Sequence, residues 1–306
     1  MSDIKDETLR PGVHAVCPLC GSDDVQTAMR CIDHFVTGEA FTISRCGHCG
    51  FHFTSDAPAE DEIGRYYRSG DYISHSDTSR GAVNKVYHLV RRYMLREKAG
   101  IVMHYTGKRR GRLLDYGAGT GYFANRMQRA GWQTEAIEPG DAARAFAFAR
   151  FGLRMKMPSD LSRMEDKSFD CITLWHVLEH VAGLHETMDE MARLLADDGI
   201  LVVAVPNRTS CDARHYGSLW AAWDVPRHLW HFAPTDIQML GNAHGFSLAE
   251  MLPMYFDAFY ISMMSEKYGH SRWPVAGGAA MGFKSLLMTL ANKERASSLI
   301  YVFKKK

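Results

Sequence analysis

The sequence predicts an α/β protein in which a mostly parallel sheet, covered by helices on both faces, follows a small N-terminal module. Two observations predict this architecture. From residue 112 onward, short apolar stretches alternate with amphipathic helical patterns, and strands joined through helices run parallel. Before residue 57, two Cys-x-x-Cys pairs lie among short stretches of alternating polarity, which are typical of small hairpins.

The composition favours a soluble globular protein. The 306 residues are 46% hydrophobic and 23% charged, which suffices for one large domain and one small domain. Thirty-six basic and 35 acidic residues give a net charge of +1, so the positive field typical of a dedicated nucleic-acid binder is absent. No apolar run approaches the about 18 residues that a membrane span needs. Residues 1–12 are polar where a signal peptide would be apolar, so we expect a cytoplasmic protein.

The first 56 residues are predicted to form a metal-bound module. Cys17 and Cys20 form one Cys-x-x-Cys pair, and Cys46 and Cys49 form the other. In a reducing compartment such pairs indicate metal rather than disulfides. Four thiolates fit a closed tetrahedral Zn²⁺ site with no open position for catalysis, so we expect one structural zinc ion in a zinc ribbon. A redox role is the alternative, but it does not call for two pairs with a glycine after each.

Residues 57–106 are predicted to be a helical linker, and residues 107–306 the main domain. Apolar residues between 81 and 106 recur at steps of three, four and seven, which marks one buried face of a long helix. These residues are Val83, Val86, Tyr87, Val90, Met94 and Ile101. In the main domain we expect strands at 112–116, 133–138, 169–175, 200–205 and 298–303, with helices ending at residues 130, 151, 196 and 243.

A glycine loop joins the first of these strands to the next helix. Gly117, Gly119 and Gly121 stand at alternate positions after a hydrophobic strand. Such glycines let the backbone turn sharply and approach a ligand, and the helix start behind them offers free N–H groups to an anion. The next strand ends at Glu138, whose carboxylate can accept both hydroxyls of a ribose. We therefore predict a nucleoside-type cofactor across the carboxyl ends of these two strands.

The glycine spacing resembles the first motif of class I S-adenosylmethionine-dependent methyltransferases. A dinucleotide-binding fold is the alternative, but its Gly-x-Gly-x-x-Gly fingerprint would need a glycine where Tyr122 stands. The resemblance implies a seven-stranded, mostly parallel, Rossmann-like sheet, with S-adenosylmethionine as cofactor and its ribose on Glu138. It also implies an adenine contact at Asp160 or Leu161. The implied cofactor-binding residues are Asp115, Gly117, Gly119, Gly121, Glu138, Asp160, Leu161 and Trp175.

Two further stretches resemble the branch of that family that includes quinone and sugar methyltransferases. Residues 168–181 are similar to the fourth strand and following turn of the branch, and residues 224–232 to a segment near its substrate side. Similar zinc-binding modules precede sugar C-methyltransferases and some ribosomal RNA methyltransferases, so the zinc ribbon does not select a substrate.

Histidines and aromatic residues of the second half are candidates for the acceptor site. Methyl transfer is an in-line displacement, so the protein aligns a nucleophile and, where required, removes its proton. Histidine is a suitable base near neutral pH. We predict that His180 and His228 are catalytic and that Arg227, Trp230 and His231 bind the substrate. A structural role is the alternative, because histidines beside tryptophans often pack and hydrogen-bond in cores.

The predicted function is methyl transfer to a small metabolite, with a saccharide or nucleotide-sugar intermediate preferred and a quinone-like ring second. An RNA methyltransferase whose zinc ribbon binds RNA is the alternative. The basic patch at 108–112 supports that alternative, and the near-zero net charge opposes it. A non-catalytic scaffold is a third reading, which the intact glycine loop and Glu138 disfavour.

Overall fold

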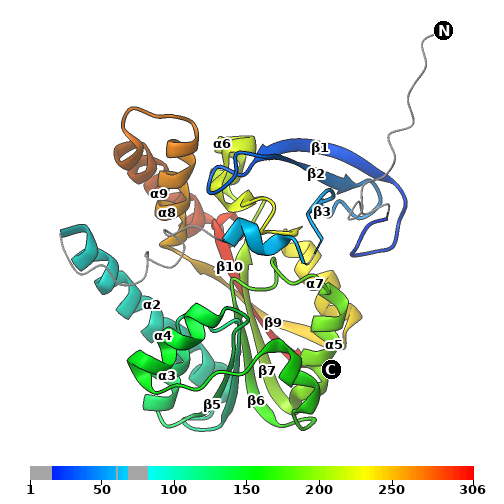
Figure 1. Cartoon of the computed structure of the whole chain (residues 1–306), viewed down its shortest axis with the longest axis vertical. Helices are drawn as coiled ribbons and strands as arrows, with labels where there is room; N and C mark the ends of the chain where they lie inside the picture. The colour runs from blue at the N-terminus through cyan, green and yellow to red at the C-terminus, as the bar shows by residue number, and fades with distance from the viewer. Residues whose placement is uncertain (1–15, 60, 68–81) are drawn as a thin grey trace.

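The computed structural model describes residues 16–59, 61–67 and 82–306, with side chains from residue 88 onward in the helix that begins at residue 82. Two sheets organise the molecule (Figure 1). The larger sheet has six strands in the order β5-β4-β6-β7-β10-β9, and the smaller has four in the order β1-β2-β3-β8. The larger sheet comprises β5 (Gln133–Ile137), β4 (Arg112–Tyr116), β6 (Phe169–Trp175), β7 (Leu195–Pro206), β10 (Ser298–Lys305) and β9 (Phe246–Met254).

The order of the larger sheet reverses at β4. This strand pairs in parallel with β5 on one side and with β6 on the other, and β6 pairs in parallel with β7. Only β10 runs the opposite way, between β7 and β9. The chain thus runs from β4 outward to β5 and returns across β4 to form β6. In open α/β sheets such a reversal leaves a crevice at the carboxyl ends of the strands.

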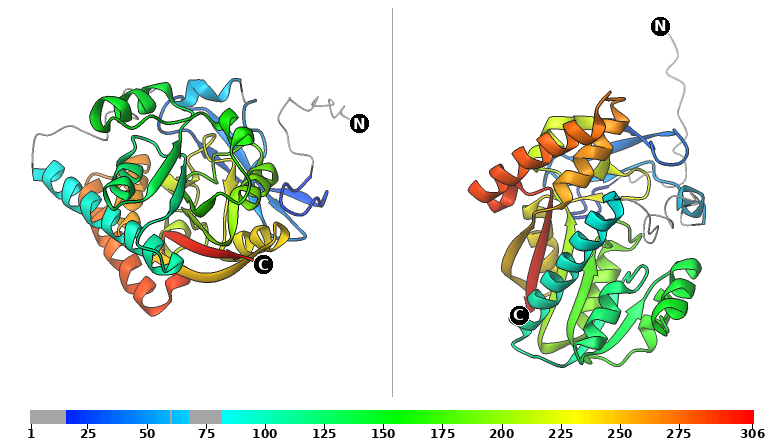
Figure 2. Two further views of the ribbon diagram at one scale, coloured as in Figure 1. Left: turned by 90° about the horizontal axis from the view of Figure 1, so that it is seen from below. Right: turned by 90° about the vertical axis from the view of Figure 1, so that its left-hand side faces the viewer.

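Helices cover both faces of this sheet because its strands are apolar on both faces. Leu113 belongs to a core cluster with residues of α2 and α3, whereas its neighbour Leu114 belongs to a cluster with residues of α5 and α7. This alternation follows from the two-residue repeat of a strand. Figure 2 shows α2 running along one face. The helices are α2 (Ala82–Thr106), α3 (Tyr122–Arg129), α4 (Asp141–Phe151), α5 (Leu184–Leu194) and α7 (Pro234–Ala243).

The smaller sheet joins the N-terminal module to a distant segment. Its strands are β1 (Val25–Ile32), β2 (Ala40–Cys46), β3 (His52–Thr54) and β8 (Trp230–His231), all antiparallel to their neighbours. Strand β8 follows β7 in the chain, so the second half of the molecule completes the N-terminal sheet. The backbone N–H of Thr54 donates to Leu229 O, and that of Leu229 donates to Glu179 O just beyond β6. The smaller sheet therefore sits over the carboxyl end of the larger one (Figure 1).

Two insertions and several short helices complete the described chain. Between β7 and β8 lie α6 (Cys211–Tyr216), η3 (Gly217–Leu219) and η4 (Ala221–Trp223). Between β9 and β10 lie α8 (Asp257–Tyr268), α9 (Pro274–Ala291) and η5 (Lys293–Arg295). The short helices η1 (Ile63–Tyr67) and η2 (Pro158–Arg163) lie in earlier connections. Across the described residues, no helix combines the length and apolar character needed to span a membrane.

The predicted fold class is confirmed, with one strand fewer than expected among the described residues. The seventh position, beyond β5, holds a single parallel bridge between Ile137 and Lys156. Pro158 follows two residues later, lacks an N–H and begins η2, so the pairing ends at once. The helix expected to end at residue 196 ends at Leu194, and β7 begins earlier than predicted. The side chains of Val83, Val86 and Tyr87, and residues 1–12, lie outside the described part. The division into three domains stays a prediction.

Candidate active site and metal centre

The glycine loop lies at the carboxyl end of β4, where the sheet order reverses. Gly117, Gly119 and Gly121 have φ angles of 73°, 54° and 78°, in the left-handed region that side chains rarely adopt. A Cβ at Gly117 would come within 2.3 Å of Val177 Cγ2, so only glycine fits there. A Cβ at Gly119 would meet nothing within 4 Å, which leaves open space in front of the loop. The predicted loop is therefore present, with its middle glycine facing that space.

Glu138 lies directly beside this loop. Its Oε2 accepts a hydrogen bond from the backbone N–H of Gly119 at 2.8 Å, and its Oε1 accepts one from Gly140 at 2.9 Å. The structure therefore brings the predicted acid and glycine loop together at the ends of adjacent strands. A carboxylate in this position can turn from the backbone donors to the hydroxyls of a ribose.

Asp115 and Trp175 lie at the ends of β4 and β6, and a lysine that the sequence analysis did not select joins them. Asp115 is buried, and its Oδ1 accepts a hydrogen bond from Thr173 Oγ1 at 2.8 Å. Burial raises the pKa of Asp115 to about 7. The ammonium of Lys98 lies 4.4 Å from the centre of the Trp175 ring, and burial lowers the pKa of Lys98. Lys98 comes from α2, and its place in a long amphipathic helix carried no signal of this contact.

Asp160 and Leu161, the predicted adenine contacts, belong to η2. The carboxylate of Asp160 accepts a hydrogen bond from the backbone N–H of Met157 at 2.9 Å, and Leu161 packs in the main core. Asp160 also lines a cavity of about 370 Å³ together with Arg112 and Phe169, the first residues of β4 and β6. These strand starts lie at the end of the sheet opposite the glycine loop. An adenine contact at either residue stays a prediction.

The two histidines predicted to be catalytic lie together, beside a carboxylate. The rings of His180 and His228 are 4.5 Å apart between centroids, edge to face. One side-chain atom from each of Glu179, His180 and His228 lies within 4.8 Å of the others. Glu179 is 1% exposed, and within the described chain neither of its carboxylate oxygens has a hydrogen-bond partner. Burial alone would raise the pKa of Glu179, but the surrounding histidines outweigh burial and lower it.

The hydrogen bonds of His180 define which ring nitrogen can act as a base. Its Nδ1 lies 3.0 Å from Arg227 O and 3.1 Å from Tyr67 Oη. Because a carbonyl oxygen only accepts, Nδ1 carries the proton and Nε2 of the neutral ring keeps its lone pair. Burial and the neighbouring His228 lower the pKa of His180 to about 4, so this ring is neutral at neutral pH. The Nδ1 of His228 likewise donates to Ala222 O at 2.9 Å.

His176 occupies the turn between β6 and Glu179 in a strained conformation. Its φ is 58°, in the left-handed region. Its Nδ1 lies 3.5 Å from Glu179 Oε1, and its Nε2 lies 3.2 Å from Asp257 Oδ2. Burial lowers the pKa of His176, but Asp257 and Glu179 outweigh burial and raise it to about 9. Sequence reasoning missed both carboxylates. The position of Glu179 between His176 and His180 in the sequence could have indicated its role, whereas nothing in the sequence around Asp257 does.

Arg227 differs from the prediction that it binds substrate. Its Nη2 contacts Asp33 Oδ1 at 3.0 Å and Asp224 Oδ1 at 2.7 Å, and its Nη1 donates to Tyr66 O at 2.9 Å. The side chain is 1% exposed, so its N–H groups are committed to internal partners. Arg227 thus ties residues 224–228 to the N-terminal module through Asp33 and to η1 through Tyr66.

Trp230 and His231 are also core residues. Trp230 is 3% exposed, donates from Nε1 to Val181 O at 2.7 Å and stacks with Phe51. His231 is buried, with Nε2 3.0 Å from Thr54 Oγ1, and burial lowers its pKa well below the usual value. Both residues form β8, so their side chains hold the two sheets together instead of lining an open acceptor site.

Comparison with known proteins places this site in a family. Residues 89–251, more than half of the chain, match the model of the methyltransferase domain family. The chain belongs to that family. Its glycine loop and Glu138 lie within the matched region.

Relatives and solved structures of methyltransferases are consistent with this membership. The chain is 26% identical over 159 residues to a ubiquinone biosynthesis O-methyltransferase of Azorhizobium caulinodans, covering 48% of this chain and 62% of that protein. It is 25% identical over 196 residues to a probable S-adenosylmethionine-dependent methyltransferase of Mycobacterium tuberculosis, covering 60% of this chain and 71% of that protein. Matches to the first relatives thus span about three fifths of their length.

The fold is shared with solved methyltransferases at low sequence identity. The geranyl diphosphate C-methyltransferase of Streptomyces coelicolor gives a TM-score of 0.53 at 14% identity, covering 82% of this chain and all of that one. The magnesium protoporphyrin IX methyltransferase of Synechocystis also gives 0.53, at 13% identity, covering 81% of this chain and all of that one. At such identity the likeness concerns the fold alone.

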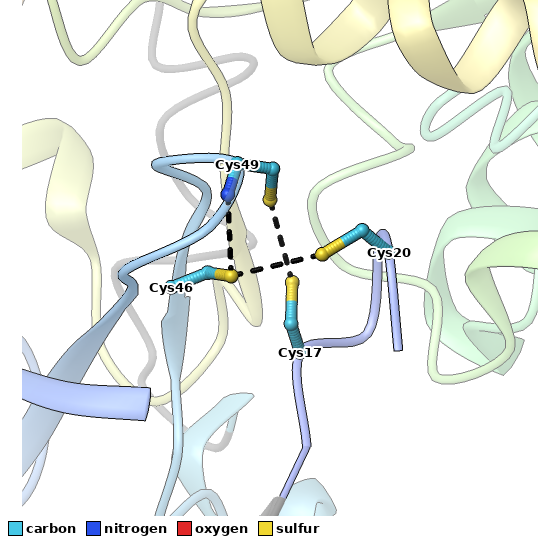
Figure 3. A group of neighbouring side chains, drawn as sticks. All are labelled: Cys17, Cys20, Cys46 and Cys49. Atoms are coloured by element: carbon cyan, nitrogen blue, oxygen red, sulfur yellow. Dashed lines mark hydrogen bonds between the residues drawn. The ribbon is translucent and has the colours of Figure 1, made fainter. Parts of the chain in front are cut away.

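A second candidate site of this methyltransferase-family chain is formed by the four cysteines of the N-terminal module. Their thiols converge on one point (Figure 3), with Sγ–Sγ distances of 3.6 Å for Cys17 and Cys49 and 3.7 Å for Cys20 and Cys46. A tetrahedral Zn²⁺ with Zn–S bonds of about 2.3 Å would place its ligands about 3.8 Å apart. The donor set and its spacing therefore fit zinc.

Each Cys-x-x-Cys pair lies in a tight turn that a backbone hydrogen bond from the following glycine closes. The backbone N–H of Gly21 donates to Cys17 O, and that of Gly50 donates to Cys46 O, both with positive φ at the glycine. Cys49 N lies 3.4 Å from Cys46 Sγ. Cys17 and Cys46 are buried in the same core cluster as residues of the larger sheet. The cysteine site is thus continuous with the methyltransferase core.

Proposed function

We propose that this chain transfers the methyl group of S-adenosylmethionine to a small acceptor molecule. The observation that carries the proposal is the placement of Gly119 and Glu138, joined by a hydrogen bond of 2.8 Å, at the point where the order of the sheet reverses. The family match over residues 89–251 supports the same cofactor.

Within this proposal, Glu138 holds the ribose and the glycine loop holds the methionine part of the cofactor. When bound, S-adenosylmethionine supplies a methyl group attached to a positively charged sulfur. Trp175 ends β6 next to β4, and the ammonium of Lys98 lies over its ring. Asp115 lies on β4 just before the loop and accepts a hydrogen bond from Thr173 on the neighbouring strand β6.

The acceptor side of the proposed site is the group of Glu179, His180 and His228. A hydroxyl on the acceptor can give its proton to Nε2 of His180, which is neutral at neutral pH and has its Nδ1–H fixed by Arg227 O. His228 lies against that ring and is the alternative base. Glu179 stabilises the positive charge that forms on the imidazole, because a buried carboxylate acts strongly on a nearby cation.

We further propose an acceptor with an ionisable hydroxyl, such as a ring phenol. Support comes from the relatives, several of which are named as ubiquinone biosynthesis O-methyltransferases. A saccharide hydroxyl, preferred from the sequence alone, becomes the second candidate. The basic patch cited for RNA is neutralised at two of its positions: Lys108 contacts Asp170 at 2.6 Å and Asp198 at 3.0 Å, and Arg112 faces Glu135 at 3.8 Å.

We also propose that the four cysteines hold one structural Zn²⁺. Cys17, Cys20, Cys46 and Cys49 would be its ligands, and a four-cysteine site leaves no position open for substrate.

Calorimetry and an acceptor screen test the cofactor and the activity separately. S-adenosylmethionine and S-adenosylhomocysteine should bind to purified protein, and NAD should not. Radiolabelled S-adenosylmethionine should then transfer its methyl group to a phenolic or saccharide acceptor from a metabolite extract. Preferential binding of NAD would refute the cofactor proposal. Methyl transfer to RNA but to no small molecule would refute the acceptor proposal alone.

A further inference from the structure

Helix α9 turns large apolar side chains toward solvent. Phe283, Leu287 and Leu290 are 57%, 53% and 66% exposed. At 100° per residue these three positions fall in one narrow band along the helix. The exposed residues of α9 are Val275, Ala276, Ala279, Ala280, Phe283, Lys284, Leu287, Leu290 and Ala291. Lys284 is the only polar residue in that set, so an apolar stripe, called here the α9 stripe, runs the length of the helix.

The buried face of α9 consists mainly of small residues. Gly278, Gly282, Ser285 and Thr289 are buried, and Met281 is the one large buried side chain. A Cβ at Gly278 would lie 2.6 Å from Met263 N, and one at Gly282 would lie 2.5 Å from a ring carbon of Phe259. These glycines therefore let α9 approach α8 closely.

This arrangement reverses that of an ordinary surface helix. A surface helix of a soluble domain buries its large apolar residues and exposes polar ones. Glycines spaced four apart at a helix contact, with large apolar residues turned outward, are typical of helices that face lipid. The pattern of α9 thus fits an apolar environment outside the protein.

The charges around the α9 stripe identify what kind of apolar surface fits it. Lys267, Arg272, Lys284, Lys293 and Arg295 lie between residues 266 and 295, against only Glu266 and Glu294. Two of these charges are engaged within the protein: Glu266 accepts a hydrogen bond from Tyr216 Oη at 3.0 Å, and Lys293 pairs with Glu250 at 2.6 Å. The remaining charges are four basic residues and Glu294. Trp273, at the start of α9, is 68% exposed, and tryptophan favours the boundary between lipid headgroups and acyl chains.

We propose that the α9 stripe attaches this protein to the surface of an anionic lipid bilayer. Phe283, Leu287 and Leu290 enter the headgroup boundary, and Lys284 and Arg272 contact lipid phosphates. The attachment is peripheral, as the described helices include none suited to crossing a membrane. A second copy of the chain fits less well, because a two-fold contact centred on Phe283 would bring the two Lys284 ammonium groups together. This inference goes beyond methyl transfer and does not depend on it.

Trp273 offers a direct reporter of the attachment. The chain has six tryptophans. Four of them, Trp132, Trp220, Trp223 and Trp230, are at most 5% exposed, and Trp175 is half-buried. Vesicles of phosphatidylcholine with phosphatidylglycerol should therefore shift the emission of the full chain to the blue, and brominated acyl chains should quench it. In Trp273→Phe these changes should disappear while cosedimentation with the vesicles persists.

A pair of substitutions tests the α9 stripe against a matched control. The double variant Phe283→Glu, Leu287→Glu should cosediment at least about tenfold less with the anionic vesicles, because each charge would have to leave water. Phe148→Glu on α4, where Phe148 is 54% exposed, should bind like the wild type. Melting temperature and S-adenosylmethionine affinity report that the variants fold.

Two outcomes would overturn the proposal. In one, the folded double variant binds anionic vesicles as tightly as the wild type. In the other, light scattering shows a wild-type dimer that the double variant abolishes, while neither protein binds vesicles; the α9 stripe would then be a contact between copies.

Discussion

The imidazole rings of His180 and His228 meet edge to face at 4.5 Å, and each ring donates from Nδ1 to a backbone carbonyl. The carbonyl bonded by His180 belongs to Arg227, and the one bonded by His228 belongs to Ala222. Both carbonyls lie in the segment between β7 and β8. Backbone anchoring of Nδ1 leaves Nε2 of the neutral His180 ring as an acceptor, whereas Nε2 of His228 lies 3.8 Å from Asp224 Oδ2. Both rings lie next to the carboxylate of Glu179.

Loss of either ring should impair turnover more than folding. We expect His180→Ala and His228→Ala to lower turnover by about 10²–10⁴, the usual contribution of a positioned general base, with cofactor affinity unchanged. His215→Ala, an exposed histidine on α6, serves as the control. Turnover and calorimetric affinity measured on the same preparations check this expectation. A drop in melting temperature with nearly normal turnover would instead assign both rings a structural role.

The ribose contact can be tested through Glu138. We expect Glu138→Ala to weaken S-adenosylhomocysteine binding by about 1.5–3 kcal/mol, the scale of hydrogen bonds to a charged acceptor. Glu135→Ala, on the same strand, is the matched control. Equal affinities of the Glu138 variant and the wild type in calorimetry would remove Glu138 from the cofactor site.

His176 should make stability fall on the alkaline side. Its pKa is about 9 in the folded protein against 6.5 as the ordinary value, because Asp257 and Glu179 favour its charged form. The resulting stabilisation is full below pH 6.5 and is lost as pH rises toward about 9. Denaturant unfolding across this range should therefore show a decline that His176→Asn reduces. An identical pH profile for the variant would show that the folded protein does not hold this charge.

His180 should act in the opposite sense on the acid side. Its folded pKa is about 4 against the ordinary 6.5, so unfolding takes up a proton between these values. The contribution of the neutral His180 ring to the free energy of unfolding is fully present above pH 6.5 and is lost as pH falls toward about 4. We expect His180→Asn to flatten this acid-side loss in the same unfolding experiment, while leaving the alkaline side as in the wild type.

Removal of the metal should unfold more than the N-terminal module. Cys46→Ser should release the zinc, and hydrogen exchange should then rise both in β1–β3 and in β8, because Cys46 shares a core cluster with Trp230. Cys211→Ser, which lies outside the cluster of four, is the control. Metal analysis of the wild type that finds less than half an equivalent of zinc under reducing conditions would contradict the site.

The parts of the site that lie close together in the chain could be predicted from sequence. The glycine loop follows one strand directly, and the cysteines come in pairs whose spacing itself defines the ligand geometry. Glu138 could be predicted as well, because the next strand in the chain is also the neighbouring strand in space. In each case the residues that form the site are close together in the chain or lie on consecutive strands that pair.

The parts that depend on distant partners could not be predicted. Arg227 had the chemistry of a substrate ligand, but its role depends on Asp33, which belongs to the N-terminal module. The pKa of His176 depends on Asp257 at the start of α8, far along the chain. Two residues suffice for β8, a strand too short to leave a periodic pattern. Such contacts are visible only once the chain is folded.

The pairing of β3 with β8 also constrains the order of folding during synthesis and the transfer of the cysteine module to another protein. Phe53 and Trp230 are register partners, so the ribosome must synthesise most of the chain before the N-terminal sheet gains its last strand. Early in translation the module has an open edge at β3. A chimera that transplants residues 16–59 alone would leave that edge facing a foreign segment. The structural unit is therefore discontinuous in the sequence. A functional graft of the cysteine module has to include residues 224–232.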